Sequence, residues 1–375
     1  MSFGLVLAGG GVRGAYHIGV WKALKEMGLD VQAVSGSSIG AINGALFAQG
    51  DLKKAMELWN KISLSDVVSL PPEVETGEDL FGIKSIIGIA KEAYKSSGLD
   101  MNPLEELLNA VIDEDVIRKS RIDFGLATYS LSRKRPVTLY KDEIPKGELV
   151  QYLMASACLP GFKTRKIDGE KFIDAGMANN MPIDLMMAKG IDDIITVDVK
   201  GIGVYKDFNT SGRNIIKIAC RQPHTGIMDF DHDGISKSIT EGYLDCKREF
   251  GLLFGSDCYF DIKEYHAVHS QYGNEIIDGV QHAARAFGID LLRIVKFENL
   301  IKEVMSAYFL QNELSSSAKP DTLEKLKKLD DKSIICNLAN TLESEGYDIV
   351  KSKLDVLGKN YGAASAIVYL KRKIN

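Results

Sequence analysis

Hydrophobic runs alternate with helical patterns along the first fifty residues. Residues 3–7 are wholly apolar and end in glycines, which predicts a strand buried on both faces. Residues 15–27 carry apolar positions at helical spacing, and Gly28 ends the pattern. Residues 31–34 predict a second strand, and residues 41–48 a helix of small residues. This repeated order of strand, turn and helix predicts a parallel sheet with helices on its faces.

The same kinds of pattern resume after residue 122. Alternating and continuous apolar runs predict strands over residues 123–131, 136–140 and 193–199, and a helical pattern covers 148–157. Short runs around the turn 168–170 predict a hairpin over residues 163–173. The first two thirds of the chain therefore read as an α/β domain, which we assign to residues 1–262.

The last third has a different character. Residues 276–287, 291–310, 322–329 and 334–354 show helical periodicity with almost no glycine, and the linker 315–320 interrupts them. We therefore predict a helical C-terminal module over residues 263–375.

One segment between the two early helices and the next strand has two interpretations. Residues 81–94 place isoleucines and aromatic residues at helical spacing, with Lys84, Lys91 and Lys95 between or beside them. Such a stripe is typical of a helix packed on the core. It also suits a lid, or a basic amphipathic face that lies on a membrane.

Charge and cysteine usage exclude several classes of function. The 46 basic and 51 acidic residues are spread without long blocks, for a net charge of −5, which does not indicate a nucleic-acid binder. The five cysteines are far apart and form no CxxC or Cys/His spacing, so we expect no metal site, no cofactor and no disulfide framework. The cysteines are Cys158, Cys220, Cys246, Cys258 and Cys336.

The location of the protein follows from its apolar segments. The N-terminus lacks the basic stretch of a signal peptide, and no run of about 18 apolar residues occurs. We therefore expect a cytoplasmic protein whose membrane contact, at the inner face, is peripheral. The sequence leaves the oligomeric state open.

A serine lies at the point where the second strand turns into a helix. Gly36-Ser37-Ser38-Ile39-Gly40 fits the pattern G-x-S-x-G of a nucleophile elbow, in which flanking glycines keep side chains away from neighbouring strands. The helix that follows points its positive end at the serine. The motif alone is weak, but its place between strand and helix favours Ser38 as a nucleophile.

A glycine loop follows the first strand and has two interpretations. Gly9, Gly10 and Gly11 can turn successive N–H groups toward one point, as the oxyanion of a tetrahedral intermediate requires. The loop also fits G-x-G-x-x-G, the fingerprint of dinucleotide-binding oxidoreductases. That alternative needs an acidic residue at the end of the second strand, where Ser35-Gly36-Ser37 stands instead.

The six histidines offer no well-placed base for Ser38. His17 falls in the first helix, where a packed histidine is the common case, and the others lie outside strong turn motifs. Asp174 ends a short strand before a loop that leads into a helix. An aspartate there can be a simple cap, but beside an elbow and a glycine loop a Ser–Asp dyad explains it better.

Three motifs in this order resemble one known family. They are Gly9-Gly10-Gly11-Val12-Arg13-Gly14, Gly36-Ser37-Ser38-Ile39-Gly40 and Asp174-Ala175-Gly176. Together they resemble the patatin-like phospholipase family, as do residues 155–162 and 179–182. The similarity covers about residues 3–200. It implies a three-layer α/β/α core with a mostly parallel sheet, and metal-free lipid acyl hydrolysis by a dyad of Ser38 and Asp174.

The resemblance also assigns roles around the dyad. It places the oxyanion hole on the glycine loop, chiefly Gly10 and Gly11, with Arg13 bracing that loop or meeting substrate. Position 175 is alanine where the family commonly has glycine. The helical module has no counterpart in the resemblance.

We therefore expect a phospholipase A, lysophospholipase or non-specific lipid acyl hydrolase. Its partner is a lipid ester substrate. A non-catalytic lipid-binding or regulatory protein on the same scaffold is the main alternative, and a dinucleotide-binding oxidoreductase is a weaker one.

Overall fold

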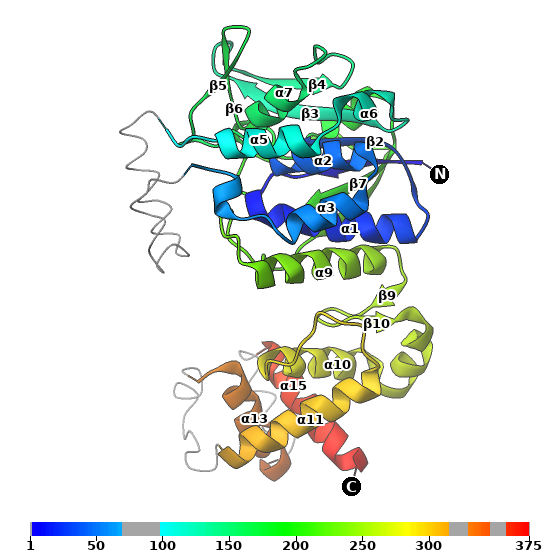
Figure 1. Cartoon of the computed structure of the whole chain (residues 1–375). Helices are drawn as coiled ribbons and strands as arrows, with labels where there is room; N and C mark the ends of the chain where they lie inside the picture. Colours follow the sequence, from blue (N-terminus) through cyan, green and yellow to red (C-terminus); the bar gives the residue numbers. More distant parts are fainter. Residues whose placement is uncertain (1, 70–97, 315–328, 346–357, 375) are drawn as a thin grey trace. The chain divides into compact units, whose positions relative to one another are not determined.

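The structure, a computed structural model, describes residues 2–69, 98–314, 329–345 and 358–374 (Figure 1). It divides into two compact units, Met1–Glu249 and Phe250–Asn375. Residues 81–94, for which the sequence leaves a core helix or a lid open, lie outside the described residues. The predicted assignment of domains to residues 1–262 and 263–375 stays a prediction.

A mixed sheet forms the centre of the first unit. In the described part its strand order is β5-β6-β3-β2-β1-β7-β8, and β4 pairs with β3. The parallel strands are β1 (Ser2–Leu7), β2 (Asp30–Ser37), β3 (Asp123–Ser130), β7 (Asp193–Asp198) and β8 (Asn214–Ala219). The antiparallel strands are β4 (Arg135–Tyr140), β5 (Arg165–Ile167) and β6 (Glu170–Ile173). The predicted, mostly parallel sheet is confirmed.

Helices cover both faces of this sheet. On one face lie α1 (Ala15–Glu26), α2 (Ile39–Gln49) and α7 (Leu149–Ser156). Gly44 of α2 packs against Val34 and Phe124. On the other face α8 (Ile183–Ala188) buries Leu185 and Met186 against the strands. Because successive side chains of a strand point to opposite faces, this arrangement is the predicted three-layer α/β/α core.

Helix α9 (His232–Glu249) lies along α1 and is not predicted from the sequence. A Cβ on Gly19 would lie 1.9 Å from the Ile239 carbonyl oxygen, and one on Gly242 would lie 2.2 Å from the Tyr16 carbonyl oxygen. The backbones of the two helices therefore lie close together at Gly19 and Gly242, where a side chain would have no room. Helix α9 is mostly polar, and its few buried apolar side chains (Ile235, Ile239, Leu244 and Cys246) are why the sequence analysis does not identify it.

Three shorter helices complete the described part of this unit. They are α3 (Leu52–Trp59), α5 (Asn102–Val111) and α6 (Glu114–Lys119). Asp51 caps α3 and Asp113 caps α6 by accepting backbone N–H groups. These helices lie around α2 (Figure 1), and α3 and α5 contribute residues to the wall of the site described below.

The second unit is helical, as predicted. Its helices are α10 (Tyr265–Ala286), α11 (Phe297–Leu314), α13 (Asp331–Glu345) and α15 (Gly358–Ile374), beside a short pair β9 (Leu253–Phe254) and β10 (Phe260–Asp261). Helix α10 begins before the predicted residue 276 and is kinked at Gly273, whose φ is 72°. Helix α11 begins later than the predicted residue 291. Within the described residues, no helix has the length and apolarity needed to cross a membrane.

Candidate active site

Ser38 occupies a strained turn between β2 and α2. Its backbone has φ 56° and ψ −126°, a conformation that only glycine adopts easily. Its carbonyl accepts the N–H groups of Ala41 (2.9 Å) and Ile42 (3.2 Å), so the serine begins the helix directly. The first N–H groups of a helix lack partners within it, and α2 therefore presents its positive end at Ser38.

The flanking glycines are required by close backbone approach. A Cβ on Gly36 would lie 2.1 Å from the Gly40 carbonyl oxygen, and one on Gly40 would lie 2.1 Å from the Leu7 carbonyl oxygen. A larger residue at Gly36 would collide with the first turn of α2, and a larger residue at Gly40 would collide with the end of β1. The G-x-S-x-G pattern thus has the steric origin expected of a nucleophile elbow.

The backbone of Ser38 also has a side-chain partner that the sequence analysis did not assign. Its N–H donates to Ser156 Oγ at 2.8 Å, and Ser156 Oγ donates to the Ala127 carbonyl at 2.7 Å. Both serines are buried. The signal available in the sequence was the segment 155–162, which carries Ser156 but no catalytic pattern of its own.

The glycine loop lies next to the elbow and is held from both sides. The Gly9 N–H donates to the Asn180 carbonyl (3.1 Å), and the Asn180 amide donates to the Gly9 carbonyl (3.2 Å). The Val12 N–H donates to the Ile227 carbonyl at 2.9 Å. The Gly9 N–H is therefore already engaged, so of the three glycines only Gly10 and Gly11 stay candidate donors to an oxyanion. Gly11 takes φ 58°.

Arg13 braces this loop. Its Nε donates to the Thr225 carbonyl at 3.2 Å, and its Nη1 donates to the Lys200 carbonyl. The guanidinium thus ties the loop to the segments that follow β7 and β8. Of the two roles expected for Arg13, these bonds favour bracing.

Asp174 follows β6 and is almost completely buried, with 3% of its surface exposed. Its Oδ1 accepts the Gly176 N–H at 2.6 Å, so the aspartate does cap the turn Ala175–Met177. Its Oδ2 is buried and has no hydrogen-bond partner among the residues that the structure describes. The carboxylate therefore has one oxygen fixed and one available.

The surroundings of Asp174 change its acidity. Burial raises the pKa of its carboxyl to about 6, and the Ser38 side chain and the Gly176 N–H hold the pKa below what burial alone would produce. The Ser38 hydroxyl is thus close enough to lower the pKa of the carboxyl, although the two groups do not meet the geometry of a hydrogen bond. A carboxylate with a raised pKa is a better general base than an ordinary aspartate.

The histidines have other environments. His17 is buried and its Nδ1 lies 3.2 Å from the Asn43 amide. Burial lowers the pKa of His17 to about 3, so the ring stays neutral in the core. His224 lies 3.4 Å from Glu241, and His282 lies 2.7 Å from Asn360. Among the residues that the structure describes, no hydrogen bond or ion pair joins a histidine to Ser38 or Asp174.

An apolar cavity opens at Ser38 and the glycine loop. Its volume is about 70 Å³, so the side chains that line it leave little free space. Its walls come from several segments: helices α2 and α5, the end of α3, the glycine loop, and residues 157–162 and 227–230. The apolar lining includes Ile42, Leu58, Trp59, Ile62, Met101, Leu104, Leu107, Leu108, Leu159, Phe162, Ile227, Met228 and Phe230.

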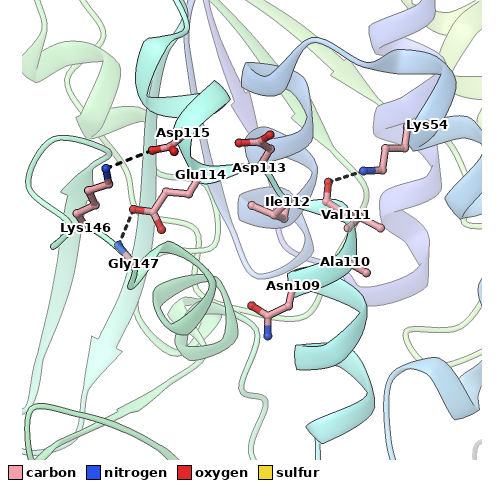
Figure 2. A pocket seen from close by; sticks show the side chains of 10 residues that line it. All are labelled: Lys54, Asn109, Ala110, Val111, Ile112, Asp113, Glu114, Asp115, Lys146 and Gly147. Atoms are coloured by element: carbon pink, nitrogen blue, oxygen red, sulfur yellow. Dashed lines mark hydrogen bonds and ion pairs between the residues drawn. The ribbon is translucent and has the colours of Figure 1, made fainter.

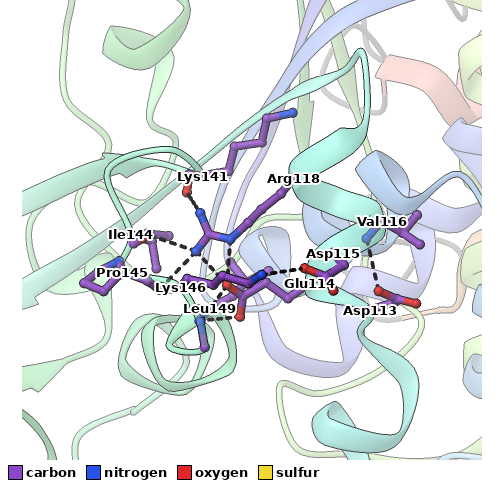
Figure 3. Close-up of polar contacts among 11 residues, drawn as sticks. Asp113, Glu114, Asp115, Val116, Arg118, Lys141, Ile144, Pro145, Lys146 and Leu149 are labelled. Atoms are coloured by element: carbon purple, nitrogen blue, oxygen red, sulfur yellow. Dashed lines mark hydrogen bonds and ion pairs between the residues drawn. The ribbon is translucent and has the colours of Figure 1, made fainter.

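A second, polar pocket lies at the far end of α5 (Figure 2). Its charged groups are engaged in local structure. Lys54 Nζ donates to the Val111 carbonyl, Glu114 accepts the Gly147 N–H, and Lys146 pairs with Asp115 at 3.5 Å. Arg118 ties Glu114 to the carbonyls around Ile144 (Figure 3). These bonds therefore stabilise the junction of α5 and α6.

Within the described residues, no three His, Cys, Asp or Glu side chains come together as a metal site would require. The five cysteines are buried as free thiols.

Comparison with known proteins matches the first unit. The sequence signature of a family described as Patatin-like phospholipase covers residues 5–187. Patatin-like phospholipase domain-containing protein 6 of Homo sapiens is 29% identical over 222 residues, which are 57% of this chain and 14% of that protein. Lysophospholipase nte1 of Aspergillus fumigatus is 28% identical over 202 residues, 54% of this chain and 12% of that protein. The match thus spans about one seventh or less of these relatives.

Solved structures resemble the chain more distantly. The crystal structure of VipD from Legionella pneumophila is 16% identical, with a TM-score of 0.38 over 97% of this chain and 88% of that one. The type III effector ExoU is 14% identical, with a TM-score of 0.32 over 96% of this chain and 76% of that one. TM-scores this low do not establish a shared arrangement of the whole chain.

Proposed function

Because residues 5–187 belong to the patatin-like phospholipase family, we propose that the chain is a serine acyl hydrolase that cleaves carboxylic esters of lipids. The observation that carries this proposal is the pairing of Ser38 with Asp174. Ser38 is buried in a strained conformation and lies close enough to the buried Asp174 carboxyl to affect its raised pKa. One oxygen of that carboxylate has no hydrogen-bond partner in the described structure.

In the proposed first step, Ser38 Oγ attacks the ester carbonyl carbon. Asp174 accepts the hydroxyl proton, and the carbonyl oxygen becomes an oxyanion that the N–H groups of Gly10 and Gly11 stabilise. The tetrahedral intermediate collapses, the leaving alcohol takes the proton from Asp174, and an acyl-enzyme on Ser38 remains.

In the second step, water attacks the acyl-enzyme. Asp174 accepts a proton from the water, the same N–H groups stabilise the second oxyanion, and Ser38 regains its proton as the fatty acid leaves. These steps use only side chains and backbone groups of this chain.

The apolar cavity supports a lipid as the substrate. Ser38 is one of the residues that line it, and the lining is almost wholly aliphatic and aromatic, which favours an acyl chain over a polar group. Whether the enzyme takes phospholipids, lysophospholipids or other lipid esters is for a panel of substrates to decide. Peripheral contact with a membrane is part of the proposal, because such substrates lie in aggregates.

Labelling by a fluorophosphonate probe tests the proposal. The wild-type chain should be labelled at Ser38 and should hydrolyse a short-chain ester, and Ser38→Ala should lose both. Ser37→Ala is the matched control, because it removes the neighbouring buried hydroxyl, which has no hydrogen-bond partner within the described structure. A folded wild-type protein that takes no label and hydrolyses no ester would instead support the non-catalytic lipid-binding alternative.

A further inference from the structure

The hydroxyl of Ser156 links the nucleophile turn to the neighbouring strand. Ser156 is the last residue of α7, with 0% of its surface exposed. We propose that Ser156 is a positioning residue, which holds Ser38 in the conformation needed for attack. This inference rests on the proposed hydrolase function and adds a residue to its machinery.

The need for such a residue arises where the sheet ends. Strand β2 pairs with β3 as far as Ser37 and Ala127, and the chain then turns through Ser38 into α2. The Ser38 N–H thus lies beyond the ladder and before the helical hydrogen bonds. A buried N–H without a partner is costly, so this position requires an acceptor from elsewhere in the fold.

Ser156 supplies that acceptor and satisfies a second group. Its Oγ accepts the Ser38 N–H at 2.8 Å and donates to the Ala127 carbonyl at 2.7 Å. A hydroxyl can accept and donate at once, whereas alanine can do neither. The Ser156 side chain therefore bridges the ends of β2 and β3 by two hydrogen bonds, beyond the last backbone pair of the two strands.

This connection bears directly on the strained conformation of Ser38. A serine with φ 56° persists only where its surroundings over-determine it. The carbonyl of Ser38 is fixed by Ala41 and Ile42, and Ser156 fixes its N–H. With the second restraint removed, the backbone can relax toward ordinary φ values, and Oγ then points away from the line between Asp174 and the acyl carbon.

The expected signature is a loss of rate without a loss of binding. Relative to wild type, Ser156→Ala should lower kcat on a short-chain soluble ester, and the rate of fluorophosphonate labelling, by ~10–100-fold per folded molecule. KM should change little, because the apolar cavity is intact. The pH midpoint of activity should also stay where it is in wild type, because Asp174 is unchanged.

Two further variants separate positioning from stability. Ser156→Thr keeps the hydroxyl and should recover part of the lost rate. Ser238→Ala is the matched control: it also removes a buried hydroxyl, which donates to the Gly234 carbonyl at 2.8 Å inside α9. It should lower the melting temperature without lowering the rate per folded molecule. If Ser156→Ala does not fold, Ser156→Cys, which offers only a weak hydrogen bond, is measured in the same way.

The outcomes are distinct. Wild-type labelling rates in folded Ser156→Ala, or in Ser156→Cys where alanine does not fold, would overturn the inference. Rate losses that merely follow the fraction unfolded, as in Ser238→Ala, would also overturn it. If folded wild-type protein itself takes no label at Ser38, the proposed function fails instead.

Discussion

Replacing Asp174 by asparagine should abolish activity and yet stabilise the protein. The substitution keeps the shape of the side chain and removes its charge. If Asp174 is the base, proton transfer is lost, and kcat/KM should fall by about 10²–10⁴-fold. A purely structural aspartate would show the opposite stability effect, because losing it would weaken the fold.

The magnitude follows from the burial of the carboxylate. Burial raises its pKa from 3.8 to about 6, and each tenfold change in proton affinity is worth about 1.4 kcal/mol. The folded state therefore disfavours the ionised form. This penalty is absent below pH 3.8, grows between pH 3.8 and 6, and levels off above pH 6 at roughly 3 kcal/mol.

The assay is thermal unfolding of both proteins at several pH values. Asp174→Asn should gain about 1.5 kcal/mol relative to wild type at pH 5 and about 3 kcal/mol at pH 8. For a unit of this size, the gain at pH 8 corresponds to roughly 6–12 °C in Tm. Asp245→Asn is the matched control, because Asp245 is equally buried but accepts from Tyr16 (2.7 Å) and pairs with Arg248 (2.8 Å). That variant should lose stability.

Two results would refute this reasoning. The first is an Asp174→Asn protein that is less stable than wild type at pH 8, since the ionised carboxylate would then be a stabilising group. The second is a difference in stability that does not grow between pH 5 and pH 8.

Two other predictions follow from the same site. First, kcat/KM on a neutral short-chain ester should rise with pH through a midpoint near 6, because Asp174 must be ionised to accept the Ser38 proton; a flat profile between pH 5 and 8 would contradict this assignment. Second, Leu108→Trp should lower hydrolysis of long-chain esters roughly tenfold more than that of short-chain esters, because Leu108 lines the apolar cavity and a larger ring occupies it. Equal losses on both chain lengths would mean that the acyl chain lies elsewhere.

Much of the fold follows from local sequence. The strands β1, β3 and β7 have nearly continuous apolar stretches, β2 has a short apolar run interrupted by Gln32, and the hairpin of β5 and β6 has a polar turn between two short runs. Such patterns are local, so they predict elements without knowledge of their neighbours. Helix α9 and strand β8 are not predicted in this way, because α9 is mostly polar and β8 is a largely exposed strand at the edge of the described sheet.

Residue type and spacing alone are enough to predict the candidate residues of the site. The glycines around Ser38 and along residues 9–14 are visible in the sequence because close approach leaves no room for a side chain. Asp174 stood out by its place after a strand and by the order of the three motifs. These features consist of residue types at particular spacings, so they can be recognised in the sequence without the structure.

Only the tertiary structure decided how these residues act on one another. The raised pKa of Asp174 depends on burial by segments distant in sequence, and the engaged Gly9 N–H depends on Asn180. The bond from Ser38 to Ser156 joins residues 118 positions apart, and no local pattern encodes such a pair. Hydrogen bonding and desolvation depend on distances in space, and these exist only once the chain has folded.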